Sequence, residues 1–333
     1  MRILYVAMVH DYGDPARGPS FEETNFRSAL DGMGHEVIPF DFMERTRRDG
    51  KRRMRSDLLR AAAEAKPDVA FFCLFTDEID PATIEGVGRE GECLTTNWFA
   101  DDHWRFDIFT RHIAPAFDLA VTTDEDALPK YSAQGIERVH LSQWACNQYA
   151  YRRAEGPLEH EVTFVGQPHA ERAAIIERVR AAGHEVECWG QGWPAGRLDH
   201  AGMVRVFGSS RVNLNLSNSS LPPNTLRVRV GRMLGRGPKG SRPAQIKGRN
   251  FEVPGCGGFL LTERVPHLER YFEPGREIGV YDDEDDLLEQ VGHWLAHDEQ
   301  RAAVADAGYR RTMADHTYDH RFVAIFSALG LPK

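Results

Sequence analysis

The chain has 333 residues, of which 41% are hydrophobic and 27% charged, which is typical of a globular protein of about two domains and argues against wholesale disorder. Fifty acidic residues against 41 basic residues give a formal net charge of −9, which disfavours general nucleic-acid binding. The longest apolar run, residues 69–75, is too short to span a bilayer. Five scattered cysteines without a Cys-x-x-Cys pair indicate a reducing, cytoplasmic compartment and no metal site.

The first half alternates predicted strands and helices. Residues 1–9 are expected to form a buried strand, residues 20–32 a helix that opens on a Ser20/Glu23 capping box, and residues 34–40 a second strand. Further strands are expected at 67–75, 92–99, 118–123 and 139–144, and helices at 58–65, after residue 80 and at 125–134. This alternation predicts a parallel sheet with helical crossovers.

The second half repeats the opening of the first. Residues 162–166, 171–182 and 183–189 are predicted as strand, helix and strand, after a polar linker at 147–161. A Gly-His-Glu-Val tetrapeptide, at Gly34 and again at Gly183, begins the second strand of each unit. The matched context predicts two Rossmann-like halves in tandem.

Two segments are strongly basic. Residues 221–250 contain no acidic residue and eight basic ones: Arg227, Arg229, Arg232, Arg236, Lys239, Arg242, Lys247 and Arg249. Arginine forks and lysine charges suit phosphate oxygens, so the segment predicts an anionic ligand such as a diphosphate; a solvated surface loop is the alternative. The second cluster, residues 45–55, is interpreted as a solvated loop or helix start, with the binding of an acidic acceptor as the alternative.

Ligands of doubly wound sheets bind beyond the carboxyl ends of the strands. In the first half this rule selects four candidates for a general base: His10, Asp11, Asp101 and Asp102. A helix cap is the alternative for the two adjacent aspartates. In the second half the same rule selects four residues for contact with the phosphates or the nucleobase of a nucleotide: Gly166, Gln167, Arg172 and Gly190. Plain turn chemistry is the alternative there.

The sequence from Arg249 to Thr262, Arg-Asn-Phe-Glu-Val-Pro-Gly-Cys-Gly-Gly-Phe-Leu-Leu-Thr, resembles the signature of the CgeB-like (spore-maturation type) glycosyltransferases of the GT-B fold. Other segments agree in order: Phe164-Val165-Gly166 with Arg172, residues 188–193, residues 212–216, and His316-Thr317-Tyr318 with Arg321. The resemblance is strongest over residues 161–321.

The resemblance implies an α/β protein with two Rossmann-like domains facing across a cleft. Residues 1–152 would bind the acceptor, residues 153–318 the donor, and residues 319–333 would form a helix returning to the first domain. The implied activity is a hexosyltransferase-like transfer from a nucleotide-diphosphate sugar (UDP, GDP or TDP type) to a glycan, protein or small-molecule acceptor. No metal and no other cofactor is expected.

Glu252 matches the second glutamate of the Glu-x7-Glu pattern of related enzymes, which accepts hydrogen bonds from the nucleotide ribose; the first would fall at Ala244. A buried structural partner of Arg249 is the alternative role for Glu252. The residues expected near the diphosphate are Lys247, Arg249, Gly257 and Gly258, although the glycines are equally typical of a tight turn.

Three other functions compete. A nucleotide-sugar epimerase-like enzyme would have the same fold and need no acceptor. A noncatalytic binding protein is mildly favoured by Ala244. An NAD-dependent dehydrogenase is disfavoured, because neither first strand is followed by the glycine fingerprint of dinucleotide binding.

Overall fold

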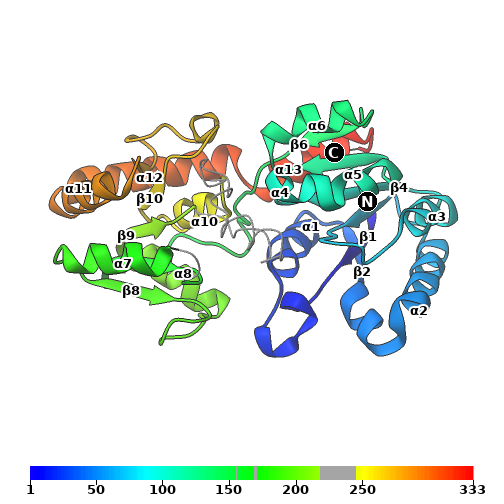
Figure 1. Ribbon diagram of the computed structural model, residues 1–333, viewed down its shortest axis with the longest axis horizontal. Helices are drawn as coiled ribbons and strands as arrows, with labels where there is room; N and C mark the ends of the chain where they lie inside the picture. Colours follow the sequence, from blue (N-terminus) through cyan, green and yellow to red (C-terminus); the bar gives the residue numbers. More distant parts are fainter. Residues whose placement is uncertain (155, 169–170, 218–244, 333) are drawn as a thin grey trace, which may run out of the picture. The chain divides into compact units, whose positions relative to one another are not determined.

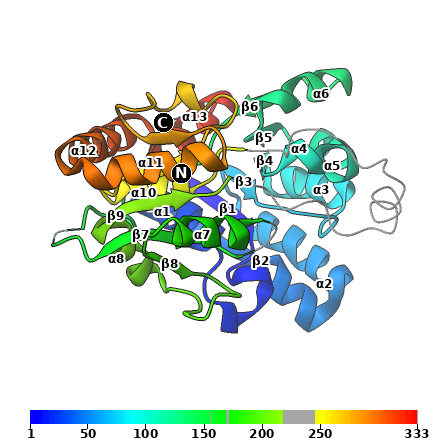
Figure 2. The same ribbon diagram turned by 60° about the vertical axis from the view of Figure 1, so that its left-hand side comes forward.

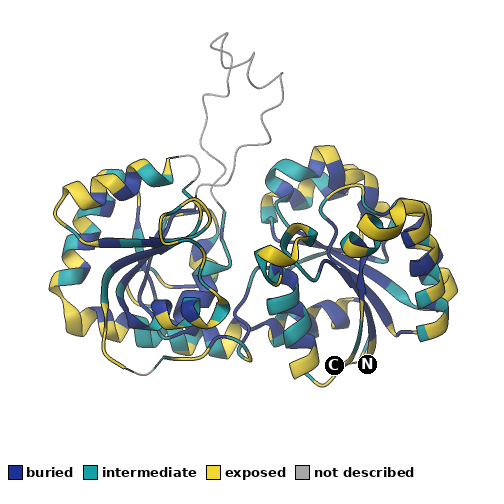
Figure 3. Cartoon of the chain, turned by 90° about the horizontal axis from the view of Figure 1, so that it is seen from below, coloured by how far each residue is buried: buried dark blue, intermediate teal, exposed yellow. Residues whose placement is uncertain are grey.

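The computed structural model describes the whole chain except residues 155, 169–170, 218–244 and 333 (Figure 1). It contains two compact units: unit 1 comprises Met1–Ala150 and Thr317–Lys333, and unit 2 comprises Tyr151–His316. The sequence had placed these boundaries after residues 152 and 318. Each unit is built around one parallel sheet with helices on both of its faces, so that buried strands lie between helices with exposed outer faces (Figure 3).

Unit 1 has a six-stranded parallel sheet in the order β2-β1-β3-β4-β5-β6. Its strands are β1 (Arg2–Ala7), β2 (Glu36–Asp41), β3 (Val69–Phe72), β4 (Leu94–Phe99), β5 (Leu119–Thr122) and β6 (Val139–Leu141). Its helices are α1 (Ser28–Gly32), α2 (Phe42–Ala65), α3 (Pro81–Gly91), α4 (Asp102–Arg105), α5 (Arg111–Ile113), α6 (Leu128–Ala133) and α13 (Tyr318–Ala328). All four residues of β3 are buried, as expected of a central parallel strand.

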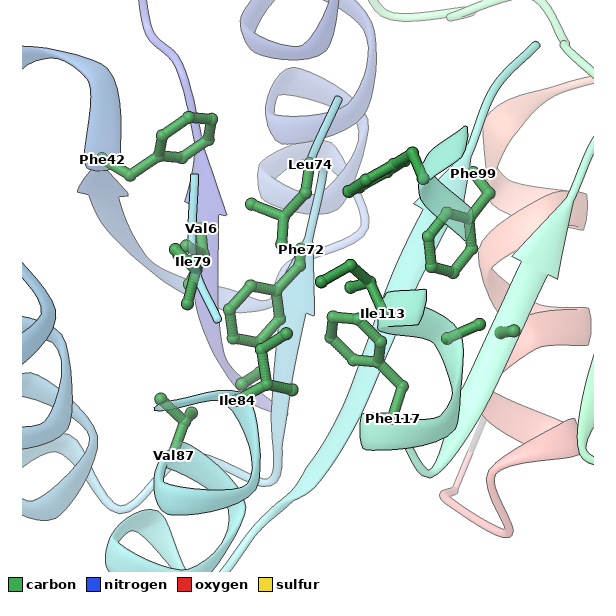
Figure 4. Packing of buried hydrophobic residues seen from close by; sticks show 14 of the residues in the cluster. Val6, Phe42, Phe72, Leu74, Ile79, Ile84, Val87, Phe99, Ile113 and Phe117 are labelled. Carbon is green, nitrogen blue, oxygen red and sulfur yellow. The ribbon is translucent and has the colours of Figure 1, made fainter. Parts of the chain in front are cut away.

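Alternate residues of the strands of unit 1 enter two separate cores. Leu4, Val6 and Phe72 belong to the core beneath α2 and α3, part of which Figure 4 shows. Their strand neighbours face the opposite core, which α13 covers: the rings of Phe71 and Phe322 lie 5.6 Å apart. The C-terminal helix α13 is therefore part of unit 1. A helix at residues 319–333 that returns to the first domain was expected from the family resemblance.

The structure gives the detail of two helix starts in unit 1. Ser20 Oγ accepts a hydrogen bond from the Glu23 amide (3.0 Å), but the Glu23 side chain pairs with Arg27, so only half of the capping box forms and the chain enters α1 through a π-helical turn, Glu23–Arg27. The basic cluster of residues 45–55, interpreted as a solvated loop or helix start, lies in the first half of a helix. This helix, α2, begins at Phe42 and breaks at Gly50, where φ is 80°.

Unit 2 has a five-stranded parallel sheet in the order β11-β10-β9-β7-β8. Figure 2 labels β9, β7 and β8 of this sheet. Its strands are β7 (His160–Val165), β8 (Val186–Trp189), β9 (Ser210–Asn215), β10 (Leu260–Glu263) and β11 (Gly279–Tyr281). Its helices are α7 (Arg172–Ala181), α8 (His200–Ser209), α10 (Arg249–Gly255), α11 (Glu284–Ala296) and α12 (Asp298–Asp315). None of the helices in the described part of the chain is long and apolar enough to span a membrane.

Candidate functional site

Two arginines meet the carboxyl ends of the strands of unit 2. Arg249 begins α10, and its Nε donates to the carbonyl of Val165, the last residue of β7 (3.3 Å). Arg172 begins α7, and its Nη2 donates to the carbonyl of Leu216, directly after β9 (2.9 Å). Burial lowers the pKa of Arg172 to about 10, and the charge of Arg249 acts in the same direction. Positive charge is therefore concentrated at the edge where doubly wound sheets bind ligands.

Glu252 lies three residues after Arg249 on α10 and is completely buried. Its Oε2 forms an ion pair with Arg249, and its Oε1 accepts no hydrogen bond from any described residue. Burial alone would lower the pKa of Arg249, but the Glu252 carboxylate outweighs it and the pKa is raised. Glu252 is thus a structural partner of Arg249, and it also has one buried acceptor atom to which the described residues provide no donor.

A buried polar network positions the start of α10. The Asn215 side-chain amide, at the end of β9, donates to Asn250 Oδ1 (3.2 Å) and to Thr262 Oγ1 (3.0 Å) on β10. Asn250 Oδ1 also accepts from the Lys247 amide (2.9 Å). The sequence interpretation missed this network, although the two asparagines in the apolar run of residues 212–216 were a signal for it.

Gly166, Gln167 and Gly190 also lie at this edge. Backbone packing accounts for Gly190, whereas a Cβ at Gly166 would meet the ring of Phe164. The Gly166 amide donates to the carbonyl of Trp189 (2.8 Å), and its carbonyl accepts from the indole of Trp193 (2.8 Å). A Cβ at Gly190, where φ is 143°, would lie 2.2 Å from the Gly166 oxygen. The carbonyl of Gln167 accepts from Arg172 Nη1 (3.4 Å).

Gly257 and Gly258 are not at the ligand edge, which corrects their expected contact with a diphosphate. They end α10 and lead into the amino end of β10, opposite the strand ends that meet Arg249. A Cβ on Gly258 would lie 2.2 Å from the carbonyl oxygen of Phe207, which is in the last turn of α8. Gly257 has φ of 75° and packs against Arg153. Both glycines serve the tight turn between helix and strand.

Most of the basic segment, residues 221–250, lies outside the described residues. This applies to Arg227, Arg229, Arg232, Arg236, Lys239 and Arg242, and also to Ala244. Lys247 and Arg249 are described, and both stand at the beginning of α10.

In unit 1, His10 and Asp11 follow β1 and are partly exposed. Asp11 Oδ2 lies 3.0 Å from Arg17 Nε, and the Asp11 amide donates to the Gly18 carbonyl (3.1 Å). Asp101 follows β4, with β3 between it and β1 in the sheet. Its backbone is left-handed (φ 64°), and its side chain does not cap α4. Asp101 Oδ2 lies 3.9 Å from Arg105 Nε.

Asp102 points into the protein, so the structure does not support it as a general base. It is fully buried, and its carboxylate accepts hydrogen bonds from the hydroxyls of Thr110 (2.6 Å), Thr122 (2.6 Å) and Tyr131 (2.7 Å). Burial raises the pKa of Asp102 to about 6, against the opposite effect of these hydroxyls. With both oxygens occupied and no exposed surface, this carboxylate cannot reach an acceptor hydroxyl.

A second buried carboxylate, Glu22, was not anticipated. It lies just before the π-helical turn and is 6% exposed. Burial raises its pKa to about 7, and the charge of Asp11 contributes in the same direction. Nothing in the local sequence pattern indicated its burial, which results from the packing of this segment against β1, where the Tyr5 hydroxyl donates to the Glu22 carbonyl (2.9 Å).

Residues 171–327 match the family model described as "Glycosyl transferase-like". The whole chain also matches solved glycosyltransferase-fold structures. It superposes on Anabaena Alr3699/HepE, solved in complex with UDP-glucose, with a TM-score of 0.63 and 10% identity over 98% of this chain and 99% of that one. A glycosyltransferase from Rickettsia africae ESF-5 gives a TM-score of 0.62 at 8% identity, covering 98% of both chains. The chain therefore has the GT-B fold of two Rossmann-like domains, and its residues 171–327 are similar to a glycosyl transferase-like family.

One relative found by sequence similarity is CgeB, whose family the signature of residues 249–262 resembles. The chain is 21% identical over 246 residues to the spore protein CgeB of Bacillus subtilis (strain 168), covering 67% of this chain and 71% of the relative. This is a similarity to CgeB and is too distant to assign the two proteins one function.

Proposed function

We propose that this protein transfers a sugar from a nucleotide-diphosphate sugar, bound by unit 2, to an acceptor bound by unit 1, and that it is of the CgeB-like type. The observation that carries the donor assignment is the buried Arg249–Glu252 pair at the carboxyl edge of the sheet of unit 2, with Glu252 Oε1 lacking a donor among the described residues. The UDP-glucose complex of the structural neighbour supports a nucleotide-sugar ligand for this fold. All five cysteines are free, in keeping with action in the reducing cytoplasm.

The chemistry assigned to each donor-site residue follows from its charge. A ribose has two hydroxyls that donate well to a carboxylate, and Glu252 Oε1 is an acceptor of the right type. Arg172, Arg249 and Lys247 would neutralise the diphosphate, which gains negative charge as the bond from its oxygen to the anomeric carbon breaks. Cations and amides would thereby supply the leaving-group stabilisation, with no metal required.

On the acceptor side the new bond forms between the anomeric carbon and an acceptor oxygen, whose proton must leave. In an inverting reaction a side-chain base takes this proton. His10, Asp11 and Asp101 remain our candidates, since all three lie beyond the carboxyl ends of β1 or β4 and are partly exposed.

The test is calorimetry of the purified chain with UDP, GDP and TDP, followed by the corresponding nucleotide sugars. We expect one nucleoside diphosphate to bind with a micromolar Kd, about −8 kcal/mol. If none of the three binds, the donor assignment is wrong. Product analysis then separates the remaining candidates: an altered free nucleotide sugar would indicate an epimerase-like enzyme, and binding without transfer or hydrolysis would indicate a noncatalytic protein.

A further inference from the structure

The loop after β1 holds an exposed aromatic ring on a strained backbone. Tyr12 has φ of 53° and ψ of 28°, in the left-handed region, and is 69% exposed. This conformation costs a non-glycine residue about 1–2 kcal/mol. Because the ring is largely exposed, its burial offsets little of that cost. Strain of this kind is often found at positions that are held for a ligand.

The ring of Tyr12 is supported from one side. The Arg17 guanidinium carbon lies 4.5 Å from the ring centroid, and Arg17 Nε lies 3.0 Å from Asp11 Oδ2. One residue of the predicted catalytic edge, one cation and one aromatic ring are therefore joined in a single loop. A ring packed against a cation on one side presents its remaining surface to solvent, as an aromatic platform for a ligand does.

The first part of α2 places positive charge beside this loop. Arg47 Nη1 donates to the carbonyl of Gly13 (3.1 Å), and Lys51 Nζ donates to the carbonyl of Asp77 (3.0 Å), in the loop that follows β3. These bonds hold the helix along the same sheet edge as His10 and Asp11. Between residues 42 and 55 the helix carries two acidic residues, Glu44 and Asp49, and seven basic ones: Arg45, Arg47, Arg48, Lys51, Arg52, Arg53 and Arg55.

Some of these arginines are not paired with a carboxylate of the described residues. Arg47 and Arg52 are exposed, and neither forms an ion pair with a carboxylate among the described residues. Arg45 lies over the ring of Phe40, with its guanidinium carbon 4.5 Å from the centroid. In a chain whose net charge is −9, this is a local positive surface that attracts an anion to one place.

We propose that Tyr12 and the arginines of α2 form the acceptor-recognition surface of unit 1, and that the acceptor is an anionic saccharide carrying carboxylate or phosphate groups. The proposal rests on the function proposed above, because it names the acceptor of that reaction. The Tyr12 ring packs against the apolar face of a sugar ring, and Arg47 and Arg52 bind its anionic groups through paired N–H donors. Asp11 then lies beside the bound acceptor, on the loop that carries Tyr12.

The test measures saccharide binding directly, without donor, using tetragalacturonate as the acidic probe and maltotetraose as a neutral probe of equal length. We expect tetragalacturonate to bind at least about tenfold more tightly at low salt, a difference of about 1.4 kcal/mol, and the preference to shrink in 0.5 M salt. The double variant Arg47→Glu/Arg52→Glu is expected to remove the preference. Asparagine tolerates the left-handed backbone, so Tyr12→Asn is expected to fold and to weaken the binding of both probes. Tyr12→Phe is expected to leave the binding of both probes unchanged.

Arg276→Glu is the control, because Arg276 is an exposed arginine of unit 2 and the substitution makes the same charge change as Arg52→Glu alone. Equal binding of the two probes, or an equal loss in Arg276→Glu, would overturn the proposal. So would binding of phosphatidylglycerol vesicles without binding of either saccharide. Should the double variant fail to fold, Arg52→Glu alone repeats the test at an exposed side chain. Binding of UDP, GDP and TDP is measured separately, so failure of all three would refute the donor assignment and leave this test intact.

Discussion

Glu252 and Arg249 form an ion pair on one turn of α10 in which the carboxylate is completely buried while its Oε1 receives no donor from the described residues. A buried acceptor without a donor costs about 1–3 kcal/mol. A ligand hydroxyl that reaches Oε1 recovers this cost on binding. If Glu252 binds the ribose as proposed, donor binding is expected to stabilise unit 2.

Replacing Glu252 by Gln or Ala is expected to weaken nucleotide-sugar binding by about 10- to 100-fold, since hydrogen bonds to a charged group contribute about 1.5–3 kcal/mol. Calorimetry measures the effect. Both variants are also expected to melt at lower temperature, because Arg249 loses its carboxylate partner. Glu299→Gln, at an exposed position on α12, is the control. Unchanged donor affinity in folded Glu252→Ala would show that this carboxylate does not bind the ribose.

Gly258→Ala tests whether this glycine serves the fold or the donor. A methyl group at this position would lie 2.2 Å from the Phe207 oxygen, so we expect a loss of about 2–4 kcal/mol in the free energy of unfolding. Donor affinity of the folded protein should be unchanged, because the residue lies at the amino end of β10. Denaturant unfolding and calorimetry give the two values. Gly292→Ala on α11, where nothing lies within 4 Å, should be neutral or stabilising; a selective loss of donor binding in Gly258→Ala would restore the phosphate role.

Asp102→Ala should destabilise unit 1 strongly. It would leave the hydroxyls of Thr110, Thr122 and Tyr131 buried without their acceptor, at a cost of about 3 kcal/mol or more. Asp102→Asn keeps one acceptor and adds a donor that a hydroxyl can accept, so its stability at pH 7 should be within about 1 kcal/mol of the wild type. Urea unfolding compares the variants. If Asp102→Asn folds normally and yet abolishes transfer, the carboxylate has a chemical role after all.

Glu22 should make stability depend on pH near neutrality. Its pKa is raised from 4.5 to about 7, so the folded protein binds this proton more tightly than the unfolded chain. The free energy of unfolding contributed by this group is therefore highest below pH 4.5 and falls as pH rises towards 7, by about 3 kcal/mol in all. Glu22→Gln should remove this slope and be more stable than the wild type at pH 8.

Melting curves of Glu22→Gln and the wild type between pH 5 and 8 measure the difference. Asp102 contributes a slope of the same sign only up to about pH 6, and burial lowers the pKa of His35 and His140, which gives a slope of the opposite sign below about pH 6.5. The difference between the two proteins in the interval from 6 to 7 therefore reports Glu22. Parallel pH profiles of the two proteins in that interval would contradict the assignment.

The alternation of strands and helices could be predicted from the sequence because it depends on local patterns. Buried parallel strands such as β3 are continuous apolar runs, and the aspartate before Pro81 caps α3, accepting from the Thr83 amide at 3.0 Å. The matched Gly-His-Glu-Val segments likewise indicated two similar halves. Residues 45–55 were left open between a loop and a helix start, because Gly50 interrupts the cluster and Asp41, which caps the helix, lies outside it.

The sequence by itself determined the α/β architecture, the family resemblance and the set of polar residues at strand ends, because each depends on residue types and their spacing. Only the tertiary structure decided what those residues face. Asp101 and Asp102 are neighbours in the chain, yet one is partly exposed and the other is buried among three hydroxyls. Gly258 lies at the opposite sheet edge from Arg249, because α10 runs against the strands. Burial and orientation depend on segments far apart in the chain, which no local pattern records.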